Sequence, residues 1–503
     1  MEKKNFALID ERLVEDTLYL KRALEIPEFP HKKPVVSPGE GIGSVLRDKN
    51  GLWKMWYTVF ITRDPQKDMV GCETPMVLAY SHDGIVWEKP AFNIAKDPVY
   101  KDHPNIVVHA RMKDASGRYI SGWGGPAGMC ILDAEMTPHP AARKRFTGLY
   151  VDFPIDVIGG ICIADSDDGI HWTIWPESPV IIGSTDTQNI LLYDKNIKKY
   201  VCYLRPVIHC GMDRHANRKI ARCESEDLIH WTIPEVVLDT DELDAPGLEV
   251  FDEPGMRGAR GRNKQFQGIS PFIRNNCYIA FTWFYDAVKG IFTNELIHSS
   301  DGINWKREPL RESFIADNKP EGFRGKLPVP FGTAPIDVGD TMYFYSSNIP
   351  YGHHEIAVAD INGSVKNRQQ LLESNEIYLI TLKRDRWIYY QAGEIEGELL
   401  TSPAEWEGGG SLCLNAKIEK DGYIRVEVDD MYGRKINDAH LDEINLITGP
   451  VNSVDIPVTF GPGPKTVMKF PLLGPIRFRF WMKKAKLYGW SFIHPVYPQK
   501  EER

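Results

Sequence analysis

Three acidic residues, Glu40, Asp186 and Glu321, stand in loop-like stretches that precede runs of alternating apolar residues. Two carboxyl groups on either side of a glycosidic bond can cleave it, one as acid and the other as base or nucleophile. Burial or a neighbouring negative charge raises the pKa of the acid partner and keeps it protonated at neutral pH. We expect Asp186 or Glu40 to act as base or nucleophile, with Glu321 as the acid.

Each of these acids also has a purely structural interpretation. Glu40 follows Pro-Gly and could cap a turn, whereas Asp186 opens Asp-Thr-Gln-Asn and could form an Asx turn. Glu321 lies in Pro-Glu-Gly-Phe-Arg-Gly-Lys and could be an exposed loop residue. Both interpretations stay open from the sequence.

Further polar and aromatic residues occupy corresponding places around other strand-like runs. Arg and amide groups hold sugar hydroxyls in fixed geometry, and an aromatic face can cover a sugar ring. Arg63 and Asp64 could instead pair with each other at the surface. The candidate substrate-binding residues are Arg63, Asp64, His103, Asn105, Gln188, Asn189, Arg205, Arg262, Gln265, Trp283, Tyr285, Asp286, His353 and His354.

The elements that must position these residues are marked by a phrase that occurs four times. It reads Ser-His-Asp-Gly-Ile-Val-Trp at residues 81–87, and it returns at residues 166–172, 225–231 and 300–305. Asp-Gly supplies a turn with positive φ, the run before it alternates like a strand, and the Trp can cover a sheet edge. One such turn per long repeat is typical of a radial array of β-sheets.

We therefore predict an all-β fold, a five-bladed β-propeller followed by a C-terminal β-sandwich. A fifth unit near residues 333–359 lacks the phrase. Residues 105–110 are expected in blade two. Residues that precede the first strand of each blade should meet at one face of the propeller. The predicted domains are an N-terminal arm at 1–30, the propeller at 31–370 and the sandwich at 371–503.

Composition limits the partners and the compartment. A net charge of −9 over 503 residues argues against nucleic acid, which needs concentrated Lys and Arg. No segment approaches a membrane span, so no membrane partner is expected. The eight Cys residues lie mostly in apolar runs and indicate buried thiols. With no apolar leader at the start, a cytoplasmic location is expected, or a periplasmic or secreted one if a signal peptide has been removed.

Cofactor and metal chemistry find little support. His209, Cys210 and His215 are close in sequence, but their spacing matches no well-defined zinc pattern. The chain has no phosphate-binding glycine loop, nucleophile elbow or dinucleotide fingerprint. We expect no metal and no organic cofactor.

Several stretches resemble a group of bacterial proteins related to glycoside hydrolase families 32 and 43, the five-bladed propeller glycosidases. The similar stretches are the phrase at 166–172, Asp-Thr-Gln-Asn at 186–189, 199–205, 218–225 and, in the second domain, 385–387, 397–401, 412–415 and 485–488. The resemblance covers nearly the whole chain and implies hydrolysis of an oligosaccharide or small glycoside. Glu40 occupies the place where those enzymes carry an Asp in blade one. The fifth-blade stretch lacks the Asp that related proteins often carry, unless Glu321 serves.

Other functions fit the same scaffold. A non-catalytic carbohydrate-binding propeller would keep the Arg and aromatic contacts without a carboxyl pair. A phosphorolytic sugar enzyme would need a cationic cluster beside a single acid. A scaffold for protein partners would show an exposed apolar patch, and the second domain could also mediate homo-oligomerisation. The residues that could form the cationic cluster are Arg262, Arg324, Lys326, His353 and His354.

Overall fold

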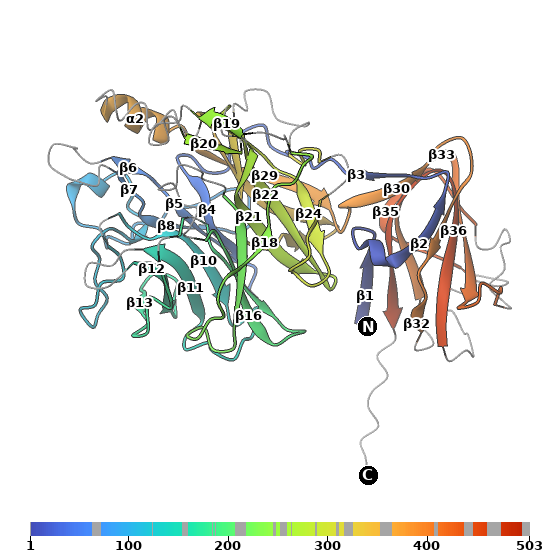
Figure 1. Cartoon of the computed structure of the whole chain (residues 1–503), viewed down its shortest axis with the longest axis horizontal. Coiled ribbons are helices and arrows are strands. Elements are labelled where there is room, and N and C mark those ends of the chain that lie inside the picture. The colour runs from blue at the N-terminus through green and yellow to red at the C-terminus, as the bar shows by residue number, and fades with distance from the viewer. Residues whose placement is uncertain are drawn as a thin grey trace, which may run out of the picture.

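The computed structural model describes most of the chain and is built almost wholly of strands (Figure 1). The helices among the described residues are α2 (Val365–Leu372) and two 3-10 turns, Glu11–Leu13 and Pro98–Tyr100. No described helix is long and apolar enough to cross a bilayer. The described residues are 2–62, 72–122, 124–152, 159–183, 185–186, 188–206, 218–244, 248–251, 259–262, 264–286, 289–307, 311–315, 325–352, 365–406, 411–436, 446–459 and 474–494.

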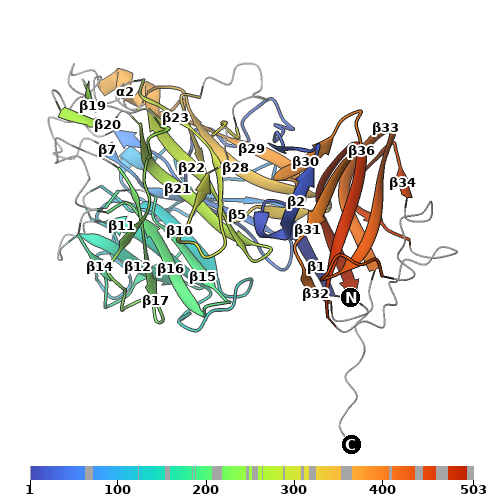
Figure 2. The same cartoon turned by 45° about the vertical axis from the view of Figure 1, so that its right-hand side comes forward.

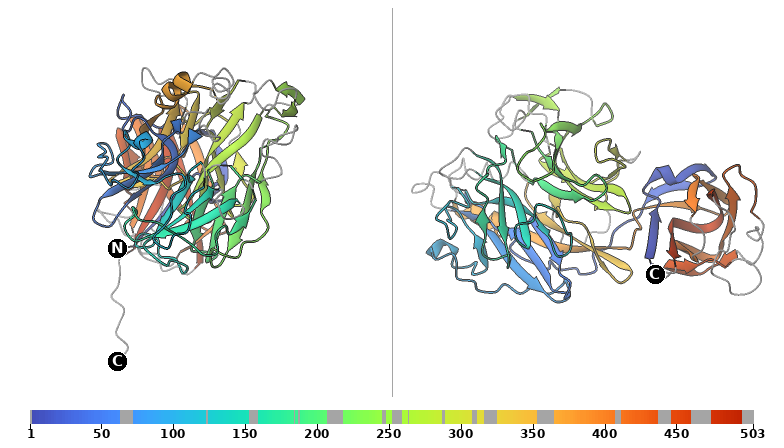
Figure 3. Two further views of the ribbon diagram at one scale, coloured as in Figure 1. Left: turned by 90° about the vertical axis from the view of Figure 1, so that its left-hand side faces the viewer. Right: turned by 90° about the horizontal axis from the view of Figure 1, so that it is seen from below.

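Five antiparallel sheets form the blades of a propeller, which confirms the predicted fold (Figure 3). Blade one is β4 (Glu40–Arg47), β5 (Trp53–Thr58), β8 (Met76–Ser81) and β9 (Ile106–Val108). Blade two is β10 (Ala127–Asp133), β11 (Phe146–Asp152), β12 (Gly160–Ser166), β13 (Thr173–Ile174) and β14 (Ile181–Ile182). Blade three is β15 (Ile190–Asp194), β16 (Lys199–Leu204), β17 (Ile220–Ser225) and β18 (Glu235–Leu238).

The remaining two blades lie next to the second domain. Blade four is β21 (Lys264–Arg274), β22 (Cys277–Asp286), β23 (Ile291–Thr293), β24 (Leu296–Ser299) and β25 (Lys306–Arg307). Blade five is β26 (Leu327–Pro330), β27 (Ile336–Val338), β28 (Thr341–Ile349) and β29 (Glu376–Lys383). Two hairpins stand outside the blades: β6 (Ile61–Thr62) with β7 (Cys72–Glu73), and β19 (Leu248–Phe251) with β20 (Ala259–Arg262).

Two strand assignments differ from the sequence prediction. Strand β9, which follows Asn105, pairs with β8 and so belongs to blade one rather than blade two. Strand β29 pairs with β28 along its whole length, so the propeller sheet extends past the predicted boundary at residue 371 to Lys383. Both strands are defined by partners distant in sequence, which a local pattern does not reveal.

The second domain, which was predicted as a β-sandwich, is a single sheet of ten strands that curls around its own apolar core. The long strands β33 and β36 pair along most of their length, and bulges in β33 interrupt their register. The predicted N-terminal arm supplies β1, β2 and β3 to this sheet (Figure 2). Its strands are β1 (Glu2–Ala7), β2 (Val14–Leu18), β3 (Lys21–Leu24), β30 (Ile388–Ala392), β31 (Gly397–Thr401), β32 (Ala404–Trp406), β33 (Ser411–Asp430), β34 (Leu446–Thr448), β35 (Val451–Pro457) and β36 (Gly474–His494).

The repeated phrase is a hydrogen-bonded turn at the end of the third strand of a blade. In the first copy the Ser81 hydroxyl accepts the Gly84 N–H at 2.9 Å, and the Asp83 carboxylate accepts two backbone N–H groups at 2.8 and 2.9 Å. The Trp87 indole donates to the Gly84 carbonyl at 3.2 Å. In the fourth copy the capping hydroxyl belongs to Ser299, one residue before the predicted start.

At three blade interfaces an aromatic side chain donates a hydrogen bond to the phrase-glycine carbonyl of the next blade. The pairs are Trp56 with Gly169, Tyr203 with Gly302 and Tyr345 with Gly84, at 2.9, 2.7 and 2.7 Å. A Cβ at Gly169 would lie 2.5 Å from the Trp56 ring, so glycine is required there. The third copy has Leu228 in place of the glycine. The Leu228 side chain packs in a core cluster that includes Leu149, which stands on β11 where an aromatic residue stands in the other blades.

The first strands of the blades surround the central channel, where side chains bridge strands that do not pair directly. The Ser44 hydroxyl of β4 accepts the Ile131 N–H of β10 at 2.9 Å. The Ser270 hydroxyl of β21 donates to the Pro330 carbonyl of β26 at 2.8 Å. These bonds satisfy polar groups around the channel and fix the spacing of the blades.

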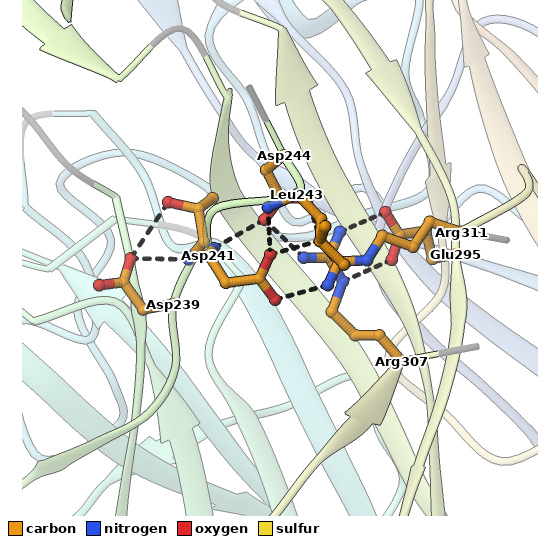
Figure 4. Close-up of polar contacts among 8 residues, drawn as sticks. Asp239, Asp241, Leu243, Asp244, Glu295, Arg307 and Arg311 are labelled. Atoms are coloured by element: carbon orange, nitrogen blue, oxygen red, sulfur yellow. Dashed lines mark hydrogen bonds and ion pairs between the residues drawn. The ribbon is translucent and has the colours of Figure 1, made fainter. Parts of the chain in front are cut away.

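An ion network joins blades three and four, with Arg307, Asp244 and Glu295 buried and Asp241 half exposed (Figure 4). The Arg307 guanidinium donates to the Glu295 carboxylate at 2.7 and 2.6 Å and to Asp244 at 2.6 Å. Arg311 adds a bond to Asp244 at 2.7 Å and two to Asp241. Because buried charges are tolerated only when they are paired, this network fixes the segment that follows β18.

Candidate active site

A cavity of about 290 Å³ lies at the end of the channel where the first strands of the blades begin. Residues from blades one, two, four and five contribute to its wall, together with Asp186 from the loop that precedes blade three, so side chains far apart in sequence meet there. This is the face of the propeller where the sequence predicted the site. The lining residues are Glu40, Ile42, Thr58, Phe60, Thr74, Gly128, Asp186, Gln267, Trp283, Phe292, Leu327, Val329 and Ile349.

Glu40 is the buried acid of this cavity. Glu40 is only 6% exposed, and its Oε2 atom has no hydrogen-bond partner among the described residues. Burial raises the pKa of the Glu40 carboxyl to about 8. The group is therefore mostly protonated at neutral pH and is able to give a proton to a bound molecule.

The position of Glu40 depends on an irregular start to β4. The pairing with β5 shifts between Glu40 and Gly43, which inserts extra residues into β4. A Cβ at Gly41 would lie 2.5 Å from the carbonyl oxygen of Val329 in blade five. Glycine thus permits the close approach of blades one and five next to Glu40, and Val329 lines the same cavity as Glu40.

Asp186 lines the same cavity but remains half exposed. Its carboxylate forms a short ion pair with the buried guanidinium of Arg205, and its side chain is 54% exposed. Asn189 donates to the Asp186 backbone carbonyl at 3.2 Å, and Thr185 donates to the Arg205 carbonyl at 2.6 Å. Asn189 and Arg205 therefore position the Asp186 loop.

Gln267 is a cavity residue that the sequence prediction missed. It is the extra residue of a bulge in β21, because Phe266 pairs with Phe284 and Gly268 with Trp283. Gln267 is 8% exposed, and its Oε1 atom is buried without a hydrogen-bond partner among the described residues. A glycine inside a strand run is a known sign of a bulge, so Gly268 was the available signal.

Trp283, which the sequence analysis proposed as a substrate-binding residue, gives the cavity an aromatic wall. Its indole N–H donates to the Ser270 hydroxyl at 3.0 Å, which fixes the plane of the ring. A Cβ at Gly268 would lie 2.8 Å from that ring, so Gly268 allows the ring to approach the strand. Phe60 and Phe292 extend the apolar wall.

Three other predicted residues do not line this cavity. Gln188 donates its amide to the Gly43 carbonyl at 3.0 Å, across the channel. Asn105 donates to the Leu78 carbonyl at 3.1 Å and is fully buried between strands. His103 lines a small hollow behind Glu40, where burial and the nearby Lys89 charge lower its pKa. The structure assigns bridging roles to Gln188 and Asn105, because the chain's own carbonyls take their N–H groups.

Gln265, Tyr285 and Asp286 form a separate polar group at the start of β21 and the end of β22. Gln265 accepts from the backbone and side-chain N–H groups of Arg218, both at 3.4 Å, and the Arg218 guanidinium lies 5.1 Å from the Tyr285 ring centre. Burial raises the pKa of Asp286, but hydrogen bonds from Lys264 at 2.7 Å and from the Lys289 N–H outweigh it, and the net pKa is lowered.

The other predicted site residues are beyond what the structure describes. Arg63, Asp64, Glu321, His353 and His354 lie outside the described residues, as do His209, Cys210 and His215. For Arg262 only the backbone is described, paired with Leu248.

Metal ligands and disulfides are also absent from the described part of the chain. No three His, Cys, Asp or Glu side chains there form a group that could hold a metal ion. Six cysteines are described with their side chains, and all six are buried free thiols.

No protein-family model and no curated protein sequence matches this chain. Solved structures do resemble it, at low sequence identity. A family 43 arabinoxylan arabinofuranohydrolase from Bacillus subtilis, in complex with cellotetraose, is 12% identical over 92% of this chain and 98% of its own, with a TM-score of 0.41. A thermostable family 43 glycoside hydrolase is 10% identical over 66% and 85%, also with a TM-score of 0.41.

A third similar structure comes from glycoside hydrolase family 130. That family is described as mannoside phosphorylases that include hydrolases of β-1,2 mannosidic linkages in Candida mannan. The structure is 14% identical over 72% of this chain and 94% of its own, with a TM-score of 0.41. At these identities the similarity is one of fold.

Proposed function

We propose that this protein is a glycoside hydrolase that acts on an oligosaccharide or small glycoside at the Glu40 cavity. The observation that carries the proposal is a buried carboxyl group with a pKa of about 8, whose Oε2 atom has no hydrogen-bond partner among the described residues, in one cavity with a second carboxylate. An aromatic wall at Trp283 supports it, because aromatic faces suit the apolar face of a sugar ring.

The two carboxyl groups would divide the reaction between them. Protonated Glu40 gives its proton to the glycosidic oxygen as the bond from the anomeric carbon to that oxygen breaks. Asp186, as a carboxylate paired with Arg205, takes a proton from the attacking water or attacks the anomeric carbon itself. In the second case water cleaves the glycosyl–enzyme bond and returns a proton to Glu40. The acid role moves from Glu321 to Glu40 in this proposal.

The test compares two leaving groups after a panel of p-nitrophenyl glycosides and oligosaccharides has identified the substrate sugar. Glu40→Gln should lower kcat/KM by about 10²–10⁴-fold on the oligosaccharide. The same substitution should lower kcat/KM much less on the p-nitrophenyl glycoside, because its phenolate leaving group departs without a proton. Asp186→Asn should impair both substrates alike. Equal activity of wild type and Glu40→Gln on the oligosaccharide would refute the assignment.

Two controls accompany this comparison. Asp194→Asn changes a carboxyl group at the opposite end of the channel and should leave kcat/KM within about twofold. Inorganic phosphate should not raise the rate of sugar release. Turnover that depends on phosphate would favour phosphorolysis instead. The kcat/KM of the wild type should fall as pH rises through about 8, because the Glu40 carboxyl then loses its proton.

A further inference from the structure

Two buried oxygen atoms in the cavity have no hydrogen-bond partner among the described residues. They are Oε2 of Glu40, from blade one, and Oε1 of Gln267, from blade four. Buried polar atoms in folded proteins are nearly always paired, so each unpaired one needs an explanation. A ligand that enters the cavity would satisfy both.

The backbone around Gln267 is built to place this amide. Gln267 is the bulged residue of β21, and a bulge redirects a side chain that regular pairing would send elsewhere. The next residue, Gly268, leaves room for the Trp283 ring beside it. The amide oxygen and the aromatic wall therefore reach the cavity from one short segment and its partner strand.

The chemistry of the amide oxygen restricts what it can bind. Oε1 of Gln267 only accepts hydrogen bonds, so its partner must be a donor such as a hydroxyl group. A carboxylate or phosphate oxygen has no proton to give. A sugar ring on the Trp283 face would present its hydroxyl groups around its edge, where such an acceptor can reach them.

We infer that Gln267 is a specificity-determining residue that accepts a hydrogen bond from one hydroxyl of the sugar bound beside Glu40. The inference rests on the proposed function for the identity of the ligand as a sugar. It predicts that one ring hydroxyl, and no other, is recognised through Gln267.

The first experiment pairs Gln267→Met with mono-deoxy forms of the sugar identified in the glycoside panel. Gln267→Met should lower kcat/KM on the parent sugar by about 10–100-fold. For the deoxy form that lacks the recognised hydroxyl, wild type and variant should be nearly equal. The same loss on every deoxy form would show that Gln267 recognises no single hydroxyl, and would overturn the inference.

The second experiment does not depend on catalysis and uses Gln265 as a matched control. Gln265 lies two residues away on β21, and its Oε1 accepts N–H groups of Arg218. Gln267→Met should raise the apparent Tm of the free protein, because an unpaired buried oxygen is removed, whereas Gln265→Met should lower it. A lower Tm for both would mark Gln267 as a structural residue and overturn the inference.

A binding measurement separates this inference from the hydrolase proposal. Methyl glycosides of the panel sugars should raise the Tm of the wild type, and Gln267→Met should reduce that rise. If they do so while no glycoside is hydrolysed, the hydrolase proposal fails and the role of Gln267 stands. If hydrolysis occurs and Gln267→Met binds and turns over the parent sugar like wild type, the hydrolase proposal stands and the role of Gln267 fails. If no methyl glycoside raises the wild-type Tm and none is hydrolysed, both fail.

Discussion

The central channel of the propeller has a cavity at each end, and the two cavities differ in how their polar groups are satisfied. The Glu40 cavity is about 290 Å³, and the opposite one, lined by the later residues of the same first strands, is about 400 Å³. In the larger cavity, among the described residues, no lining side chain carries a buried polar atom without a partner. In the smaller cavity Glu40 and Gln267 each carry one.

The two cavities are therefore distinguished by the state of their polar groups rather than by their volumes. At the larger cavity Asp194 forms a short hydrogen bond with the Tyr278 hydroxyl, and Thr333 accepts the Val45 N–H at 3.3 Å. These groups are already used to hold strands together. At the smaller cavity, two buried oxygen atoms have no partner among the described residues, and burying such atoms unpaired costs free energy.

The largest difference between the two ends should appear in the pH dependence of stability. The pKa of Glu40 rises from 4.5 to about 8 on folding, so the folded state binds more protons between those values. The stability of the wild type should therefore fall as pH rises from about 4.5 to 8. Glu40→Gln removes this loss and should be more stable at pH 7, on the order of 3 kcal/mol, with no difference near pH 4.

Chemical denaturation of both proteins at pH 4, 5.5 and 7 measures this difference. Asp194→Asn serves as the control carboxyl from the other end. It should show no such gain at pH 7, because Asp194 already has the Tyr278 hydroxyl as its partner. A Glu40→Gln protein that is less stable than wild type at pH 7 would contradict the buried, unpaired state of Glu40.

A smaller effect of opposite sign is expected at the larger cavity. Tyr278→Phe removes the hydroxyl that donates to Asp194, a residue only 3% exposed. The loss of a hydrogen bond to a charged group should lower the free energy of unfolding by about 1.5–3 kcal/mol. Activity at saturating substrate should stay unchanged at a temperature where the variant is folded. A loss of kcat would show that the two ends of the channel are coupled.

The smallest effect is expected at the rim of the larger cavity. Lys195 lines that rim, and its side chain is exposed. Lys195→Ala should change the free energy of unfolding by less than about 0.5 kcal/mol. It should also leave KM unchanged. An increase in KM would indicate that substrate contacts this end, and the two cavities would then need a common explanation.

The blade repeats could be predicted from the sequence because their stabilising bonds are local. The Ser81 hydroxyl and the Gly84 N–H are three residues apart, so a short sequence motif is enough to predict the turn. The edge strands were harder to assign to a blade from the sequence. Strand β9 has only three residues, and it belongs to blade one because it pairs with β8. Blade five has no phrase and was found only by strand alternation.

The sequence predicted that Glu40, Asp186 and Trp283 lie at one end of the channel, but it did not predict the burial of Glu40 or the bulge at Gln267. Glu40, Asp186 and Trp283 were expected because they come from predicted positions on the propeller. The raised pKa of Glu40 could not be predicted, because the residue is buried where blades one and five come together, an arrangement set by tertiary packing. Gln267 was missed because a bulge is defined by two strands at once, and Gln265 beside it fits the simple alternation equally well.

Among the described residues, strand β1 near one end of the sequence pairs with β36 near the other end. Glu2–Ala7 forms β1 and joins β36, whose final residue is His494, while Glu28 and Val36 bridge to β29 at the edge of blade five. During synthesis the N-terminal strands therefore leave the ribosome long before their partners exist. Closing such distant contacts is slow, and exposed strand edges attract other chains in the interval. The sheet that contains β1 is thus completed only after the propeller between β3 and β30 has been synthesised.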